Sequence, residues 1–237
     1  MTEPLFRTDP YLRRCTAKVT GLAEAGALIV DRSVFYPAGG GQPGDSGRLE
    51  WSGGVVEITD TIRAESGLAL VPGPGAVLPA VGEGVEMVLD WDRRHRHMRV
   101  HTALHLLSVV LPLPVTGGAI GADKGRLDFD MPDAPGDKAV LEAALNALIA
   151  RELPVTEEWI TEAELAANPG LVKTMSVQPP KGQGRVRLVR IGAGPAPVDL
   201  QPCGGTHVAN TAEIGQVQLG KIEKKGRQNR RVTVLLT

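Results

Sequence analysis

The spacing of apolar and polar residues changes near Trp91, where short alternating segments give way to longer helical ones. Before that point, four segments of four to six residues combine β-branched side chains with nearby Gly or Pro, as short strands do. They cover residues 15–20, 27–30, 54–59 and 85–89. Such a series predicts a small antiparallel β-barrel over residues 1–90.

After Trp91, helical and strand patterns alternate. Apolar residues at helical spacing predict helices over residues 95–111, 138–151 and 162–167. Alternating segments rich in β-branched residues predict strands over residues 185–191, 215–219 and 230–236. Helices combined with an antiparallel sheet predict an α+β two-layer sandwich over residues 91–237, so the expected fold class is α+β.

The composition is that of an ordinary globular protein, with 42% hydrophobic and 22% charged residues among 237. No apolar run approaches the roughly 18 residues that span a bilayer. Residues 1–10 lack the apolar stretch of a secretory signal peptide. Two cysteines, Cys15 and Cys203, are too few for a disulfide framework and suit a reducing compartment. We therefore expect a cytoplasmic protein without a membrane partner.

The formal net charge of −1 hides an uneven distribution. Residues 181–231 contain ten Lys or Arg against three acidic residues, and a second basic cluster occupies residues 93–99. A polyanionic substrate would require such a surface. A solvated charged face with no ligand is the alternative interpretation.

Two pairs of metal-type ligands carry the clearest chemistry. The spacing His101-x-x-x-His105 places two imidazoles one turn apart on one face of a helix. The segment Cys203-Gly-Gly-Thr-His207 adds a thiolate and a third imidazole, and Pro202 and the two glycines predict a tight loop there. Three imidazoles and one thiolate suit a single tetrahedral zinc ion.

Each ligand also has a purely structural interpretation, because isolated histidines on an apolar helix and lone cysteines are often inert core groups. His97 lies one turn before His101 and is assigned to the basic cluster, with support of a ligand as the alternative. Asp199 and Glu213 flank the cysteine loop and are expected to face solvent, so no general base is identified. Four tight ligands would make the zinc structural, whereas one displaced ligand would admit water or substrate.

Other hydrolase motifs are missing from the sequence. It contains neither a Gly-x-Ser-x-Gly elbow nor a His-Glu-x-x-His helix. Residues 35–47 are rich in glycine but have no Gly-Lys-Ser/Thr, so they do not form a P-loop. Two interpretations of this segment remain: it is a turn between barrel strands, or its backbone is held close to a ligand.

Taken in order, residues 35–47, 101–107 and 203–208, continuing to 210–215, resemble the editing domain of alanyl-tRNA synthetase and its free-standing relatives, the AlaX proteins. The resemblance runs from about residue 15 to the end of the sequence. What remains is too short for the aminoacylation domain, so the resemblance implies a free-standing editor of the longer type. The family fold is a translation-factor-like barrel followed by an α+β sandwich shared with threonyl-tRNA synthetase.

The resemblance also implies a function and a site. Zinc would be held by four catalytic ligands, His101, His105, Cys203 and His207. The reaction would be ATP-independent hydrolysis of mischarged Ser-tRNA(Ala), with Gly-tRNA(Ala) as a further substrate and tRNA, not DNA, as the partner. Substrate discrimination would fall on the glycine segment, at Gly39, Gly40, Gly41 and Gln42.

One segment departs from the family pattern. Synthetase editing domains carry a polar, Gln-containing stretch after the first ligand helix, where this chain has residues 115–119, Val-Thr-Gly-Gly-Ala. Thr116 is the residue there expected to contact a serine hydroxyl. Two alternatives stay open: an RNA-binding module with a structural zinc, and a deacylase acting on another mischarged tRNA such as Ser-tRNA(Thr).

Overall fold

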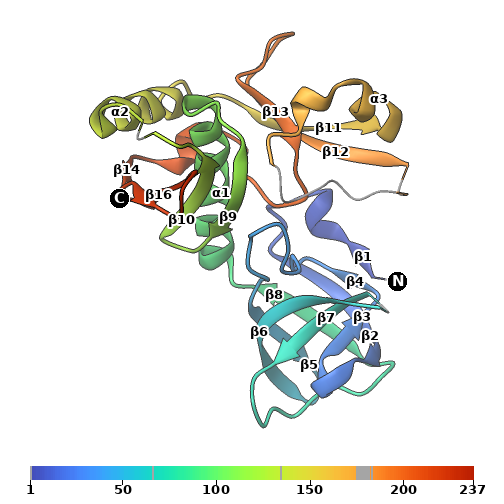
Figure 1. Cartoon of the computed structure of the whole chain (residues 1–237). Helices are drawn as coiled ribbons and strands as arrows, with labels where there is room; N and C mark the ends of the chain where they lie inside the picture. Colours follow the sequence, from blue (N-terminus) through green and yellow to red (C-terminus); the bar gives the residue numbers. More distant parts are fainter. Residues whose placement is uncertain (1, 66, 134, 175–181, 183) are drawn as a thin grey trace. The chain divides into compact units, whose positions relative to one another are not determined.

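The computed structural model describes residues 2–65, 67–133, 135–174, 182 and 184–237 (Figure 1). The chain forms two compact units, residues 1–95 and 96–237. Within the described residues, none of the helices combines the length and the apolar character needed to cross a lipid bilayer.

The first unit is a closed six-stranded barrel in the order β2-β3-β7-β6-β5-β8, with every neighbouring pair antiparallel. Its strands are β2 (Arg14–Leu22), β3 (Leu28–Val30), β5 (Gly47–Trp51), β6 (Gly54–Ala64), β7 (Gly67–Pro72) and β8 (Gly84–Leu89). Fully buried apolar side chains such as Leu49, Leu70 and Met87 fill its interior. The predicted antiparallel barrel is confirmed.

Short elements complete this unit. Strands β1 (Glu3–Pro4) and β4 (Arg32–Ser33) pair in parallel, and the 3-10 helices are η1 (Leu5–Arg7) and η2 (Glu24–Gly26).

The glycine-rich segment, residues 35–47, joins β4 to β5 through a two-residue turn. Gly39 and Gln42 exchange two backbone hydrogen bonds of 3.0 Å, with Gly40 and Gly41 at φ angles of 59° and 83°. Both angles lie in the left-handed region, which glycine adopts without strain. The Tyr36 hydroxyl donates to the Gly39 carbonyl at 2.9 Å. The turn geometry therefore accounts for two of the three successive glycines.

A buried ion pair fixes the base of this segment. Arg94 is fully buried, and its guanidinium donates to the Asp45 carboxylate and to the carbonyls of Val34 (2.7 Å) and Pro10 (3.0 Å). Asp45 also accepts from the Tyr36 backbone N–H at 2.6 Å. The expectation that Arg94 belongs to a basic surface is wrong, because a distant carboxylate neutralises it inside the protein.

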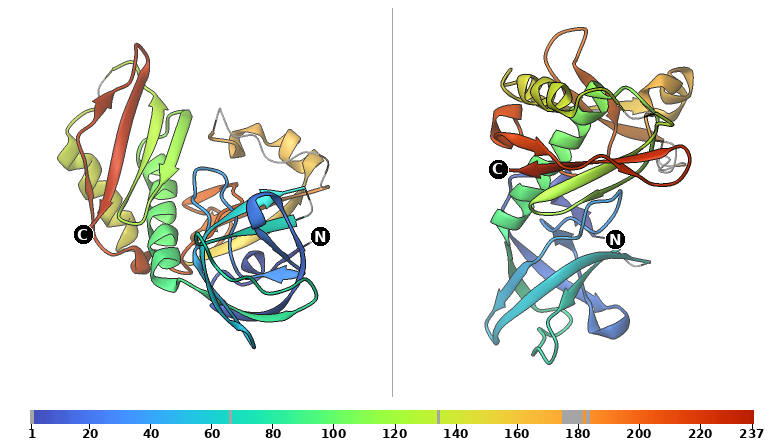
Figure 2. Two further views of the ribbon diagram at one scale, coloured as in Figure 1. Left: turned by 90° about the horizontal axis from the view of Figure 1, so that it is seen from below. Right: turned by 60° about the vertical axis from the view of Figure 1, so that its left-hand side comes forward.

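Within its described residues, the second unit combines helices with two antiparallel sheets (Figures 1 and 2). The helices are α1 (Trp91–Val110), which begins in the first unit, α2 (Lys138–Ile149), α3 (Glu162–Ala167), η3 (Pro169–Leu171) and η4 (Thr211–Ile214). One sheet has the order β14-β16-β10-β9, with β15 beside β16; the other has the order β11-β12-β13.

The strands of the first sheet are β9 (Val115–Ile120), β10 (Lys124–Asp130), β14 (Val217–Leu219), β15 (Glu223–Lys224) and β16 (Asn229–Leu236). Those of the second are β11 (Val155–Thr161), β12 (Arg185–Ile191) and β13 (Asp199–Pro202). The α+β fold class is confirmed, although the sequence did not indicate that the strands divide into two sheets.

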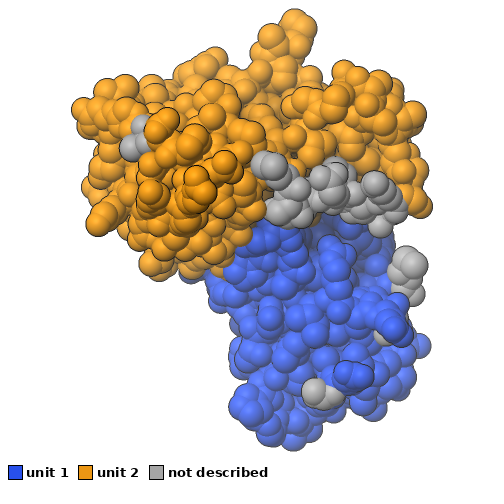
Figure 3. Space-filling view, in the orientation of Figure 1, with its two compact units in different colours: residues 1–95 blue, residues 96–237 orange. Residues whose placement is uncertain are grey.

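Helix α1 packs directly on the larger sheet. A Cβ atom at Gly125 of β10 would lie 2.5 Å from the Val100 side chain and 2.9 Å from that of Leu104, so the glycine permits this close approach. The helix begins at Trp91, earlier than predicted, because the Asp90 carboxylate accepts from the Arg93 backbone N–H at 3.2 Å and caps the first turn. Figure 3 colours the first unit blue and the second orange.

Candidate metal centre

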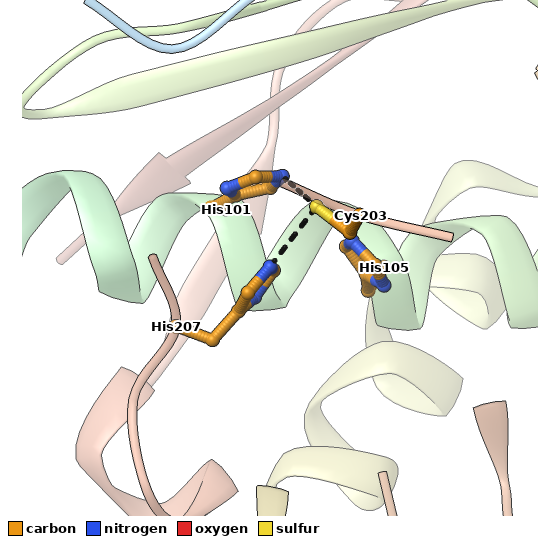
Figure 4. A group of neighbouring side chains, drawn as sticks. All are labelled: His101, His105, Cys203 and His207. Atoms are coloured by element: carbon orange, nitrogen blue, oxygen red, sulfur yellow. Dashed lines mark hydrogen bonds between the residues drawn. The ribbon is translucent and has the colours of Figure 1, made fainter. Parts of the chain in front are cut away.

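Four side chains from two distant segments converge in the second unit (Figure 4). Helix α1 presents His101 and His105, and the loop after β13 presents Cys203 and His207. Their candidate ligand atoms all lie within 4.8 Å of one another. The Cys203 Sγ is 3.5 Å from His101 Nε2 and 3.3 Å from His207 Nε2.

These distances fit a zinc ion. Tetrahedral zinc, with about 2.0–2.1 Å to nitrogen and about 2.3 Å to sulfur, holds neighbouring ligand atoms about 3.3–3.6 Å apart. The two sulfur–nitrogen distances fall in that range. The three histidines are buried, whereas Cys203 is half-buried and Gly204 is exposed. The cluster is therefore most accessible from the side of the sulfur.

The protonation states also suit a cation. Burial opposes ionisation of Cys203, but His101 and His207 outweigh it and hold the pKa of the thiol well below its usual value. Burial, followed by the effect of His101, lowers the pKa of His207 well below its usual value. Both shifts favour the forms that bind metals, a thiolate at Cys203 and a neutral imidazole at His207.

His105 is held by a buried carboxylate. Its Nδ1 lies 2.9 Å from Oδ2 of Asp199, which is only 2% exposed. Burial alone would disfavour a charged His105 and a charged Asp199. The hydrogen bond between them outweighs burial, and Cys203 adds to the effect on His105 while Lys173 adds to the effect on Asp199. The pKa of His105 is raised to about 9 and that of Asp199 is lowered to about 2. An ionised carboxylate only accepts, so Nδ1 carries a proton and Nε2 faces the cluster.

The expectation that Asp199 faces solvent is wrong. Asp199 belongs to strand β13, and its side chain reaches α1 instead of projecting from a loop. Glu213 is half-buried, and its carboxylate accepts from the Asn210 backbone N–H at 3.1 Å, completing a cap on η4.

Thr102 orients another ligand and was not identified from the sequence. Its hydroxyl donates to the Met98 carbonyl at 2.9 Å, so it accepts from His207 Nδ1 at 3.2 Å. That bond leaves His207 Nε2 free of a proton and directed at Cys203. In the sequence, only its position next to His101 could have drawn attention to Thr102. Helical spacing does not indicate that its hydroxyl contacts His207, which is 105 residues away.

The cysteine loop is held by backbone contacts. Arg187 of β12 donates to the carbonyls of Cys203 (2.7 Å) and Gly205 (2.9 Å) and pairs with Glu157. The Gly205 N–H lies 3.5 Å from the Cys203 sulfur, a contact that stabilises a thiolate. Arg187 therefore holds the loop. Its place in the basic segment had suggested a phosphate-binding surface, and that expectation is wrong for this residue.

Other members of the predicted basic surface are also engaged internally. Arg190 pairs with Glu158, Arg231 pairs with Asp128 at 2.7 Å, and His97 is 2% exposed. The predicted surface is therefore smaller than the charge count indicates.

The predicted substrate-binding residues belong to other elements than the four candidate ligands. Thr116 belongs to β9, and its hydroxyl donates to the Asp128 carbonyl of β10 at 3.1 Å. Gly39, Gly40, Gly41 and Gln42 form the turn in the first unit. Their role in binding substrate remains a prediction.

Comparisons with known proteins relate both parts of the chain to aminoacyl-tRNA synthetases. The family "tRNA synthetases class II (A)" matches residues 13–93, and the "Threonyl and Alanyl tRNA synthetase second additional domain" matches residues 186–233. The "Alanyl-tRNA editing protein AlaX-M" of Methanosarcina acetivorans is 34% identical over 98% of both chains. The AlaX-M protein of Saccharolobus solfataricus is 32% identical over 98% of both.

A longer relative shares the same region. The alanine–tRNA ligase of Pyrobaculum arsenaticum is 35% identical over 94% of this chain, which spans 25% of the ligase. Cys203 and His207 thus lie in the region that matches the additional domain of threonyl- and alanyl-tRNA synthetases. The chain belongs to the AlaX family of alanyl-tRNA editing proteins.

Proposed function

We propose that this chain is a zinc-dependent aminoacyl-tRNA deacylase that acts in trans on mischarged tRNA(Ala) in the cytoplasm. Ser-tRNA(Ala) is the principal substrate, and Gly-tRNA(Ala), which has no hydroxyl to recognise, is a second one that would have to be selected by its small size. The observation that carries the proposal is the convergence of three imidazoles and a thiolate in a chain of this family.

The reaction adds water across the ester that joins the amino acid to the terminal ribose. The bond between the carbonyl carbon and the ribose oxygen breaks, giving a free amino acid and an uncharged tRNA without ATP. A bound zinc ion supplies the Lewis acidity for this hydrolysis. The chain contributes preorganised ligands, because Asp199 and Thr102 fix two imidazole tautomers and Gly205 supports the thiolate.

Selectivity needs a site that recognises one hydroxyl group. An apolar synthetase pocket rejects an analogue with an added hydroxyl by only about 10²-fold, so a second, hydrolytic step is required. A site that hydrogen-bonds serine spares alanine, which would leave buried polar groups unpaired. Thr116 suits this role, because its own proton is donated to Asp128 and its oxygen can still accept from serine.

A deacylation panel tests this function. Zinc-loaded protein should release serine from Ser-tRNA(Ala) at least about 100-fold faster than alanine from Ala-tRNA(Ala). Hydrolysis of both at equal rates, or of neither, would contradict the proposal. Faster hydrolysis of Ser-tRNA(Thr) would reassign the tRNA, and tight tRNA binding without turnover would favour an RNA-binding module.

The β15–β16 hairpin is the expected contact for tRNA phosphates. Lys221, just before β15, and Lys224 and Arg227 in the hairpin are exposed, and among the described residues their side chains form no hydrogen bond or ion pair. Replacing Lys224 and Arg227 together with Gln should raise KM and leave kcat unchanged. The slope of log KM against log salt should fall by about two, one for each lost contact.

Lys124 and Arg151 offer a matched control. Both are exposed cations of the same unit that lie outside the hairpin. Replacing these two with Gln removes the same charge and should leave the salt slope unchanged. Equal slopes for both double variants would show that only net charge matters.

A further inference from the structure

A buried polar network connects His105 to a lysine outside the four-residue cluster. The Asp199 Oδ2 accepts from His105 Nδ1 at 2.9 Å and from Gln201 Nε2 at 2.8 Å. Its Oδ1 accepts from Lys173 Nζ at 2.5 Å. Gln201 also donates to the Ser108 hydroxyl at 3.3 Å, so the network contacts α1 at two residues, His105 and Ser108.

The stability of the fold does not by itself explain why a charged network is buried here. A buried carboxylate is costly unless it is fully paired, and replacing a buried ion pair by apolar residues is often neutral or stabilising. Asp199 is 2% exposed, and every partner named above donates to it. The Lys173 side chain is 28% exposed, so a partly solvated ammonium neutralises the carboxylate. This arrangement indicates a role at the metal centre.

Lys173 also contacts the strand of the candidate substrate residue. Its backbone carbonyl accepts from the Val115 N–H at 3.0 Å, at the start of β9, next to Thr116. A substitution of the Lys173 side chain leaves this backbone bond in place. The ionic role of Lys173 can therefore be tested separately from its backbone role.

We propose that Asp199 and Lys173 are positioning residues that set the metal affinity of the cluster. Asp199 holds the His105 ring so that Nε2 faces the metal, and Lys173 supplies the counter-charge that keeps Asp199 in place. Partners of this kind typically change metal affinity by about 10- to 100-fold. The inference rests on the metal-dependent function proposed above.

Zinc titration against a chromophoric chelator, without tRNA, is the decisive experiment. Asp199→Asn, which keeps the shape but loses the charge, should weaken zinc binding about 10-fold, and Asp199→Ala about 100-fold. Lys173→Met should also weaken it about 10-fold, and Lys173→Arg should restore it. Because both residues act through His105, the effects of the two substitutions should not add. The Asp199→Asn/Lys173→Met double variant should therefore bind zinc about as weakly as Asp199→Asn alone.

The Glu158–Arg190 pair on β11 and β12 provides the control. Glu158→Gln should leave the zinc Kd unchanged, and the circular dichroism spectrum of every metal-free variant should show that it is folded under the titration conditions. An unchanged zinc Kd in Asp199→Asn and Lys173→Met would overturn the inference, as would a parent protein that binds no zinc. A parent that binds zinc but cleaves no aminoacyl-tRNA would refute only the proposed function.

Discussion

Cys203→Ala should lower kcat/KM for Ser-tRNA(Ala) by on the order of 10³-fold, the scale of losing one electrostatic group at an active site. The substitution removes the sulfur that lies 3.3 Å from His207 and 3.5 Å from His101. The remaining imidazoles lose their only anionic partner within the cluster, so zinc binding should weaken as well. Deacylation rates and metal content per chain measure both effects.

The second cysteine of the chain provides a control. Cys15 lies on β2 in the barrel unit, so Cys15→Ala should change neither the zinc content nor the rate. A Cys203→Ala variant with parental activity and zinc content would rule out the assigned role of the cluster.

The same variant separates a catalytic zinc from a structural one. A structural zinc supplies folding free energy, so its loss would unfold the second unit. That unit already has two hydrogen-bonded sheets, with α1 packed on one of them. We therefore expect Cys203→Ala to keep its circular dichroism spectrum and to lose turnover. Loss of both would favour the RNA-binding alternative.

The candidate ligands could be predicted because their signals are local. His101 and His105 are one helical turn apart, and Cys203 and His207 are separated by two glycines and a threonine. The barrel and the helices were accessible for the same reason, since hydrophobic periodicity is a short-range pattern. Strand β9 was missed because Gly117 and Gly118 interrupt its alternation.

The supporting residues could not be predicted because their partners are distant in sequence. Asp199 meets His105 across 94 residues, and Thr102 meets His207 across 105. A carboxylate beside a loop has no sequence feature that distinguishes burial from exposure. For the same reason Arg187 could not be recognised from sequence as a residue that holds the cysteine loop.

Asp45→Ala should destabilise the barrel unit by about 3–5 kcal/mol, because it leaves Arg94 buried without its carboxylate. The variant also removes the acceptor for the Tyr36 N–H at the base of the glycine segment. Urea unfolding followed by the fluorescence of Trp51 and Trp91, both in this unit, measures the loss.

An exposed pair in the same barrel calibrates that prediction. Arg48 and Glu50 form an ion pair at 2.7 Å with side chains 40% and 34% exposed, so Glu50→Ala should cost less than about 1 kcal/mol. Replacing Asp45 and Arg94 together by Leu and Met should recover part of the Asp45→Ala loss, since no uncompensated charge then remains buried. Equal costs for Asp45→Ala and Glu50→Ala would mean that burial of the pair contributes nothing to the stability of the barrel.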